Sequence, residues 1–181
     1  ERFYEKNGSN RTVDLEELFV TYGLENVSVK AGRQAISTDW MNKTHDALKV
    51  DASFGDTSVE AIWSLRDGRV YSRDYRPLEK MNDKDGAYKL GLTQKFNENI
   101  SATAYGLVMP NTKEIYGAKT NLTFGDTALR LHYAISEEDK AVIDDSNIID
   151  LMASTSIAGF SPYIGYVKVD SGAAFPGYST D

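Results

Sequence analysis

Residues 48–65 read LKVDASF-GD-TSVEAIWSL, two alternating segments on either side of a short turn. In the first segment Leu, Val, Ala and Phe fall on one side of an extended chain, and Lys, Asp and Ser fall on the other. Gly55 and Asp56 suit the backbone dihedrals of a tight hairpin turn. The stretch therefore predicts two antiparallel strands with one apolar face and one polar face.

The same alternation fills most of the chain, and helical periodicity is scarce. Ten strands are predicted, at residues 18–24, 27–31, 48–54, 59–65, 88–96, 100–109, 116–124, 129–135, 149–157 and 163–169. Short turns alternate with longer polar loops, which lie at residues 37–46, 67–85, 110–114 and 136–147. If each strand pairs with its chain neighbour, the short turns share one end of the sheet and the long loops share the other. This layout predicts an all-β, antiparallel up-and-down meander that is part of a transmembrane β-barrel.

The composition excludes several classes of protein. The chain has 181 residues, of which 41% are hydrophobic and 26% charged, so a folded domain is expected. The formal net charge is -7, so the chain as a whole lacks the positive charge that attracts nucleic acid. The chain has no Cys, so disulfides and thiolate metal sites are excluded, and only His45 and His132 could supply imidazole chemistry. We therefore predict no enzyme activity, no metal and no cofactor.

Aromatic residues precede the short turns. The sequence Phe-Gly-Asp-Thr occurs at 54–57 and again at 124–127, and residues 96–99 are a looser copy. Phe54, Phe96 and Phe124 fall on the apolar face of their strands, at the end where the short turns lie. A barrel places an aromatic girdle there, whereas an aromatic that simply finishes a hairpin occurs in any β protein.

The sequence resembles the Opr-type porins of campylobacter-like bacteria, the family that includes their major outer-membrane proteins. The resemblance rests on LEELFVTY at residues 15–22, on NVSVKAGRQ at 26–34 and on the repeated Phe-Gly-Asp-Thr hairpins. It implies a larger homotrimeric barrel of about 16–18 strands in the bacterial outer membrane. It also implies contact with outer-membrane lipid and passive diffusion of small hydrophilic solutes and ions.

The ends of the sequence add an expectation about length. Residues 2–4 resemble the end of a further strand, and residues 170–181 resemble the start of another long loop. Residues 1–181 are therefore expected to be a partial porin barrel domain, with about ten strands and an N-terminal stub.

If the apolar face meets lipid, the alternate face lines water, and its charges set the preference of the pore. Residue parity within the predicted strands selects a mixed, slightly basic set of pore-lining candidates. They are Glu17, Lys30, Lys49, Asp51, Glu60, Lys89, Lys119, Arg130, His132 and Asp150. In a soluble sandwich the same residues would form the outward face.

The longest predicted loop, residues 67–85, is rich in charge. Long loops of such barrels can fold inward and narrow the channel. We expect Arg69, Arg73 and Arg76 to form a constriction that faces wall residues such as Glu60 and Asp51. A loop that points outward is the alternative.

Two other functions fit parts of the pattern. A soluble or surface-exposed β-sandwich for binding or adhesion would show the same alternation, but with Greek-key connections and a buried apolar face. An outer-membrane hydrolase could use His45 beside Asp46 to activate water. Both the connectivity and the position of residues such as Leu48, Leu90 and Leu129 distinguish the sandwich from the porin.

Overall fold

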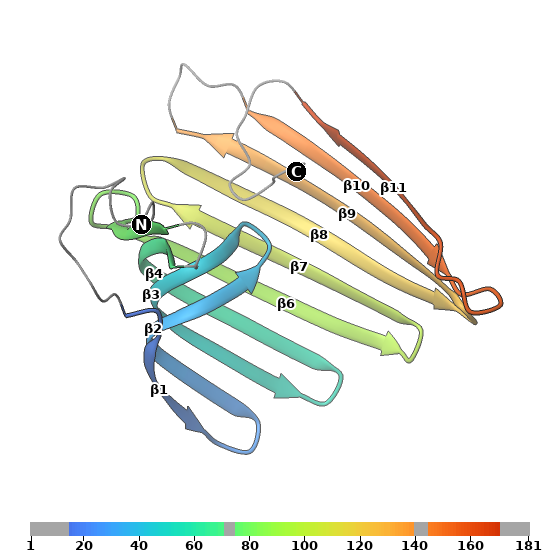
Figure 1. Cartoon of the computed structure of the whole chain (residues 1–181), viewed down its shortest axis with the longest axis horizontal. Coiled ribbons are helices and arrows are strands. Elements are labelled where there is room, and N and C mark those ends of the chain that lie inside the picture. The colour runs from blue at the N-terminus through green and yellow to red at the C-terminus, as the bar shows by residue number, and fades with distance from the viewer. Residues whose placement is uncertain (1–14, 71–74, 140–144, 171–181) are drawn as a thin grey trace, which may run out of the picture.

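A computed structural model shows the chain as one curved antiparallel sheet (Figure 1). It describes residues 15–70, 75–139 and 145–170. The described residues form eleven strands: β1 (Leu18–Gly23), β2 (Val27–Thr38), β3 (Met41–Phe54), β4 (Thr57–Val70), β5 (Tyr75–Lys80), β6 (Ala87–Asn97), β7 (Ile100–Met109), β8 (Lys113–Phe124), β9 (Thr127–Glu138), β10 (Ser146–Thr155) and β11 (Tyr163–Val169).

Connectivity follows the chain. Ten of these strands pair in chain order from β1 to β11, while β5 turns back on β4 and lies off this path. The predicted all-β antiparallel meander is confirmed, and the described strands contain no Greek-key crossover. Within the same residues no helix is long and apolar enough to cross a membrane.

The short turns adopt the geometry that their sequence requires. Gly55 and Gly125 have φ of 58° and 57°, at the first position of the turns that follow Phe54 and Phe124. A positive φ at the first turn residue, without one at the second residue, Asp56 or Asp126, is the pattern of the type II′ hairpin turn, whose twist matches that of the strands it joins. Glycine occupies it because other residues are strained there.

Two stretches predicted as loops contain strand: the first lengthens two predicted strands, and the second adds β5, which raises the number of described strands to eleven. Residues 37–46 form the tip of the β2–β3 hairpin, with the pairs Ile36–Lys43 and Thr38–Met41 and a turn at Trp40, whose φ is 67°. Residues 67–85 contain the end of β4 and all of β5. Neither face of these segments is uniformly apolar, so their residues show only weak alternation. The backbones pair all the same, and the sequence pattern therefore missed them. The N-terminal stub predicted at residues 2–4 lies outside the described residues.

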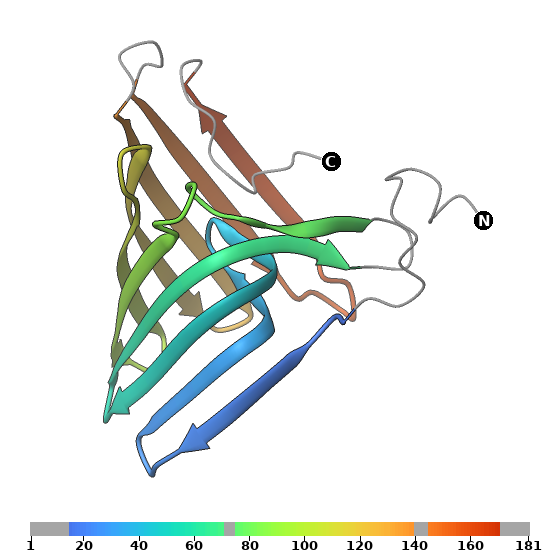
Figure 2. The same cartoon turned by 90° about the vertical axis from the view of Figure 1, so that its left-hand side faces the viewer.

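The sheet bends where the hairpins leave it. Between β3 and β4 the pairs Asp46–Arg66 and Ala47–Ser64 leave Leu65 as an extra residue, which is a β-bulge. A bulge bends and twists its strand. Up to Ser64, β4 pairs with β6, and from Arg66 onward it pairs with β5. Figure 2 shows the sheet curved like part of a cylinder, with the tip of the β2–β3 hairpin inside the curve.

We predict that Gly125→Ala destabilises the protein by about 1–2 kcal/mol, because alanine pays that cost in the left-handed region. A Cβ at Gly125 meets no atom within 4 Å, so the effect is purely conformational. Gly23→Ala is the matched control, since that position is equally open and its φ is not left-handed. Urea unfolding in detergent measures both variants, and an equal change in the two would contradict the assignment.

Candidate functional site

Nine of the ten predicted pore-lining residues share one face of the sheet. Cross-strand pairs join Lys30 to Lys49 and Asp51 to Glu60, and residues directly opposite each other point to the same side. The register continues through Ile62, which is opposite both Lys49 and Lys89. It places on this inner face Lys30, Lys49, Asp51, Glu60, Lys89, Lys119, Arg130, His132 and Asp150.

Glu17 lies just before β1. Its carboxylate accepts a hydrogen bond of 2.8 Å from the backbone N–H of Ala35. This contact links the start of the sheet to the hairpin.

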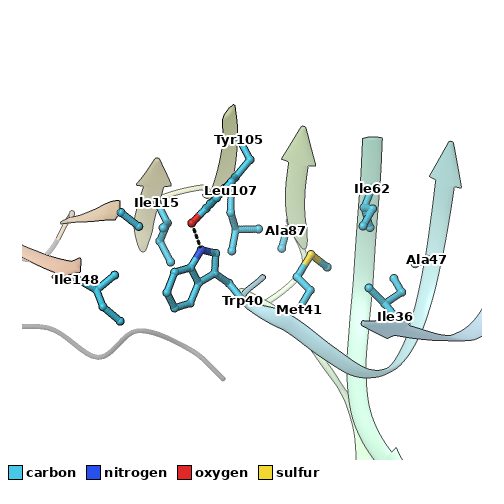
Figure 3. Close-up of a cluster of buried hydrophobic side chains, with 11 residues drawn as sticks. Ile36, Trp40, Met41, Ala47, Ile62, Ala87, Tyr105, Leu107, Ile115 and Ile148 are labelled. Carbon is cyan, nitrogen blue, oxygen red and sulfur yellow. Dashed lines mark hydrogen bonds between the residues drawn. The ribbon is translucent and has the colours of Figure 1, made fainter. Parts of the chain in front are cut away.

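An apolar patch interrupts the polar inner face near the hairpin. Leu107, Ile115 and Ile148 have their side chains on the inner face, and all three are fully buried. Trp40 of the β2–β3 hairpin lies against them, and the same cluster continues through Met41 near Ala87 and Ile36 near Ile62 (Figure 3). The core of this chain is therefore the contact between the hairpin and the inner face of the wall.

Trp40 reaches far across the sheet. Its indole N–H donates a hydrogen bond of 2.8 Å to Tyr105 Oη, which lies 2.6 Å from His132 Nε2. The Trp40 and His132 ring centroids are 5.7 Å apart. In a flat sheet β3 and β9 would be separated by five strand spacings, or about 24 Å. Curvature and inward folding of the hairpin together close this gap.

A glycine makes room for the Tyr105 ring. Gly117 is directly opposite Tyr105 on β8, and a Cβ there would lie 2.2 Å from Tyr105 Oη. The phenol therefore occupies the space above Gly117, where it reaches both Trp40 and His132.

An ion pair fixes the hairpin tip a second time. Asp39 Oδ2 lies 2.6 Å from Lys119 Nζ on β8. Along the wall, Glu60 accepts from Lys89 at 2.9 Å and lies 3.2 Å from Lys49, which is also 2.8 Å from Asp51. The wall is thus a chain of opposite charges on neighbouring strands.

Arg130 and Asp150 continue this pattern toward the other edge, with Arg130 Nη2 2.8 Å from Asp150 Oδ2.

Two of the three predicted constriction arginines lie in strands of the β4–β5 hairpin. Arg69 is in β4, Arg76 is in β5 and forms an ion pair with Asp67, and Arg73 lies outside the described residues. Asp67 also binds Lys43 at 3.3 Å.

His45 and Asp46 do not act together. Neighbouring residues in a strand point to opposite faces. The buried His45 ring is 2.9 Å from Ser64 Oγ, while Asp46 forms an ion pair with Arg33 at 2.9 Å. The pair proposed for a hydrolase is therefore separated by the pleat.

Aromatic residues mark both ends of the outer face. Phe54, Phe96 and Phe124 are each at least 60% exposed, beside the short turns. At the other end Trp63 stacks on Tyr88, with centroids 6.4 Å apart and planes at 11°. Trp63 lies six residues along β4 from Thr57, the partner of Phe54, which is about 20 Å of strand.

Sequence reasoning missed the residues that hold the hairpin. Trp40 and Met41 stand in an otherwise polar stretch, and this was the available signal that the stretch packs against something. Tyr105 and Leu107 occupy the inner phase of their strand, where polar residues were expected.

The fold matches solved structures, although the sequence matches little. No protein-family model matches the chain, and no curated protein matches it significantly. A BenF-like porin from Pseudomonas fluorescens Pf-5 has a TM-score of 0.66 at 14% identity, over 82% of this chain and 44% of that one. The outer membrane protein opdK from Pseudomonas aeruginosa gives 0.65 at 16%, over 83% and 47%. Acinetobacter baumannii OccAB1 gives 0.69 at 15%, over 88% and 47%.

These likenesses establish the class of fold. The chain has the fold of a porin β-barrel wall, and its described sheet is not closed. It spans about half the length of the solved structures that it matches.

We predict that Gly117→Ala releases the hairpin, because the added Cβ displaces the Tyr105 ring and breaks its contacts with Trp40 and His132. The readout is Trp40 fluorescence of residues 1–181 in a Trp63→Phe background, where Trp40 is the only tryptophan of that sequence. The expected result is a red-shifted emission and stronger quenching by acrylamide.

Gly165→Ala is the matched control, since its Cβ meets only Leu151 O at 3.9 Å. Unchanged quenching in Gly117→Ala, or an equal change in both variants, would show that Tyr105 does not hold the hairpin.

Proposed function

We propose that this chain forms part of the wall of a bacterial outer-membrane porin, a channel for passive diffusion of small hydrophilic solutes and ions. The observation that carries the proposal is the division of the sheet into two faces. The inner face holds the paired charges under the hairpin, and the opposite face is apolar and exposed. Passive diffusion needs no catalytic group.

The outer face suits lipid. Leu90 is 58% exposed, Leu92 49% and Leu131 45%, with aromatic residues at both ends of the strands. A soluble sandwich would bury such a face in its core. Most strands have 10–14 residues, and a tilted strand needs about 9–11 to cross a bilayer. We therefore assign Phe54, Phe96 and Phe124 to an aromatic girdle at the short-turn end.

The inner face suits a water-filled lumen. We assign Glu17, Lys30, Lys49, Asp51, Glu60, Lys89, Lys119, Arg130, His132 and Asp150 to the pore wall. The tip of the β2–β3 hairpin would narrow this lumen, since its residues Asp39 and Trp40 lie on the inner face of the wall. Arg69, Arg73 and Arg76 stay a prediction for the same constriction.

Closure of the barrel needs more strands. In the described chain β1 and β11 each pair on one side only. An unpaired strand edge in lipid is costly, because no water is present to bind its backbone groups. We propose that further polypeptide completes residues 1–181 into a barrel, that the barrel is a homotrimer, and that it is related to the porins of campylobacter-like bacteria.

The direct test is single-channel recording in a planar bilayer with the complete polypeptide that contains this chain. We expect steady conductance steps. Asp39→Asn leaves Lys119 without its 2.6 Å partner, so the reversal potential in a salt gradient should shift toward anion preference relative to the parent. Asp56→Asn, in an exposed short turn, is the control and should not shift it. Absence of steps would reject the pore.

The lipid-facing side is tested by Leu92→Arg. A charge near the bilayer midplane costs about 2–4 kcal/mol, so folding into phospholipid vesicles should weaken by that amount. Ser28→Arg is the control, because Ser28 lies on the inner face opposite Asp51. Urea titration of vesicle-folded protein compares the two. A larger loss in Ser28→Arg would reverse the assignment of the faces.

A further inference from the structure

A cleft of about 540 Å³ lies on the inner face beneath the hairpin tip. Its wall combines Asp39 from the tip with Glu60, Lys89 and Lys119 from β4, β6 and β8. This volume lies in the range of protein sites for small molecules, about 300–1,000 Å³. Gly91 lines the cleft without a side chain, and a Cβ there would fit, with its nearest neighbours at 3.9 Å, so the glycine leaves that space to the cleft.

The charges of the cleft are already matched. Asp39 is paired with Lys119, and Glu60 with Lys89. Asp51, which also lines the cleft, is paired with Lys49 of the same strand. Three lysines therefore face three carboxylates, and their formal charges cancel. A charged solute could bind strongly only by breaking one of these pairs.

Hydroxyl groups provide the remaining polar surface. Besides the Tyr105 phenol, which is already bonded to Trp40, six aliphatic hydroxyls line the cleft, on Ser37, Thr38, Ser53, Ser58, Thr93 and Thr103. Each can donate one hydrogen bond and accept others. Thr93 and Thr103 lie directly opposite each other and their hydroxyls are 2.8 Å apart. An apolar solute would leave these groups desolvated without a partner, which is unfavourable.

We propose that this hydroxyl cleft binds neutral polyhydroxylated solutes of about monosaccharide size as they cross the pore. Thr38 donates to the backbone carbonyl of Asp39 at 3.3 Å, and Thr93 is bonded to Thr103, but each of these hydroxyls can still accept from a solute. Such a solute bonds to the hydroxyls in place of water and leaves every ion pair intact. The inference rests on the proposed function of the chain as a pore wall, and it names the class of solute that the wall selects.

The test uses the complete polypeptide in a planar bilayer with potassium chloride and increasing D-glucose. Glucose bound in the cleft obstructs ions, so conductance should fall to a plateau. The effect of viscosity alone would be a continuous decline. L-Glutamine, a zwitterion of similar size, is the comparison and should give no plateau.

The variant Thr93→Val with Thr103→Val removes both hydroxyls of one pair. Valine has nearly the shape of threonine, and replacing both partners of a hydrogen bond is close to neutral for folding. Two lost hydrogen bonds should weaken the glucose effect roughly tenfold. Thr120→Val makes the same change on the outer face, opposite Leu131, and should leave the glucose effect unchanged.

The outcomes separate the two proposals. A glucose plateau that weakens in the double variant and persists in Thr120→Val supports the hydroxyl cleft. Steady channel steps without a glucose plateau, a stronger plateau with L-glutamine, or an unaltered double variant would overturn the cleft and leave the pore standing. Absence of channel steps would overturn the proposed function and the cleft with it.

Discussion

The hydrogen bond from Trp40 to Tyr105 holds together the two parts of this structure. A curved wall of paired strands carries an apolar patch on a face that is otherwise polar, and a hairpin from the same wall covers it. Without that contact Leu107 and Ile115 would face water. The hairpin folds inward over this patch, and β4, the strand next to it, is bent at the β-bulge of Leu65.

Inward folding also shapes the electrostatics of the inner face. The hairpin tip carries Asp39 to Lys119, four strand spacings from β3 along the sheet. It thereby completes a series of ion pairs on neighbouring strands that includes Glu60 with Lys89. Charge around the hairpin tip is balanced locally, and hydroxyl groups are the remaining polar surface of the cleft under the tip.

The wall could be predicted from the sequence, and the hairpin could not. Where one face of the wall is apolar and exposed and the other is polar, apolar and polar residues alternate, as in 48–54. The register places Lys49 and Asp51 on one face and Leu48 and Val50 on the other, in the phase that the alternation predicts. Alternation is weak in residues 37–46 because, in this stretch, Trp40 and Met41 are the residues that pack against the wall. Cross-sheet contacts such as Trp40 with His132 depend on curvature, which period-2 patterns do not encode.

The most direct test of the account is zero-length carbodiimide coupling followed by mass spectrometry of the detergent-solubilised protein. Asp39 and Lys119 are in direct contact, so an amide cross-link between them is expected, together with local links such as Glu60 to Lys89. Lys119→Arg should remove only the first of these. Recovery of the local links without any link from Asp39 to Lys119 would mean that the hairpin does not lie across the inner face.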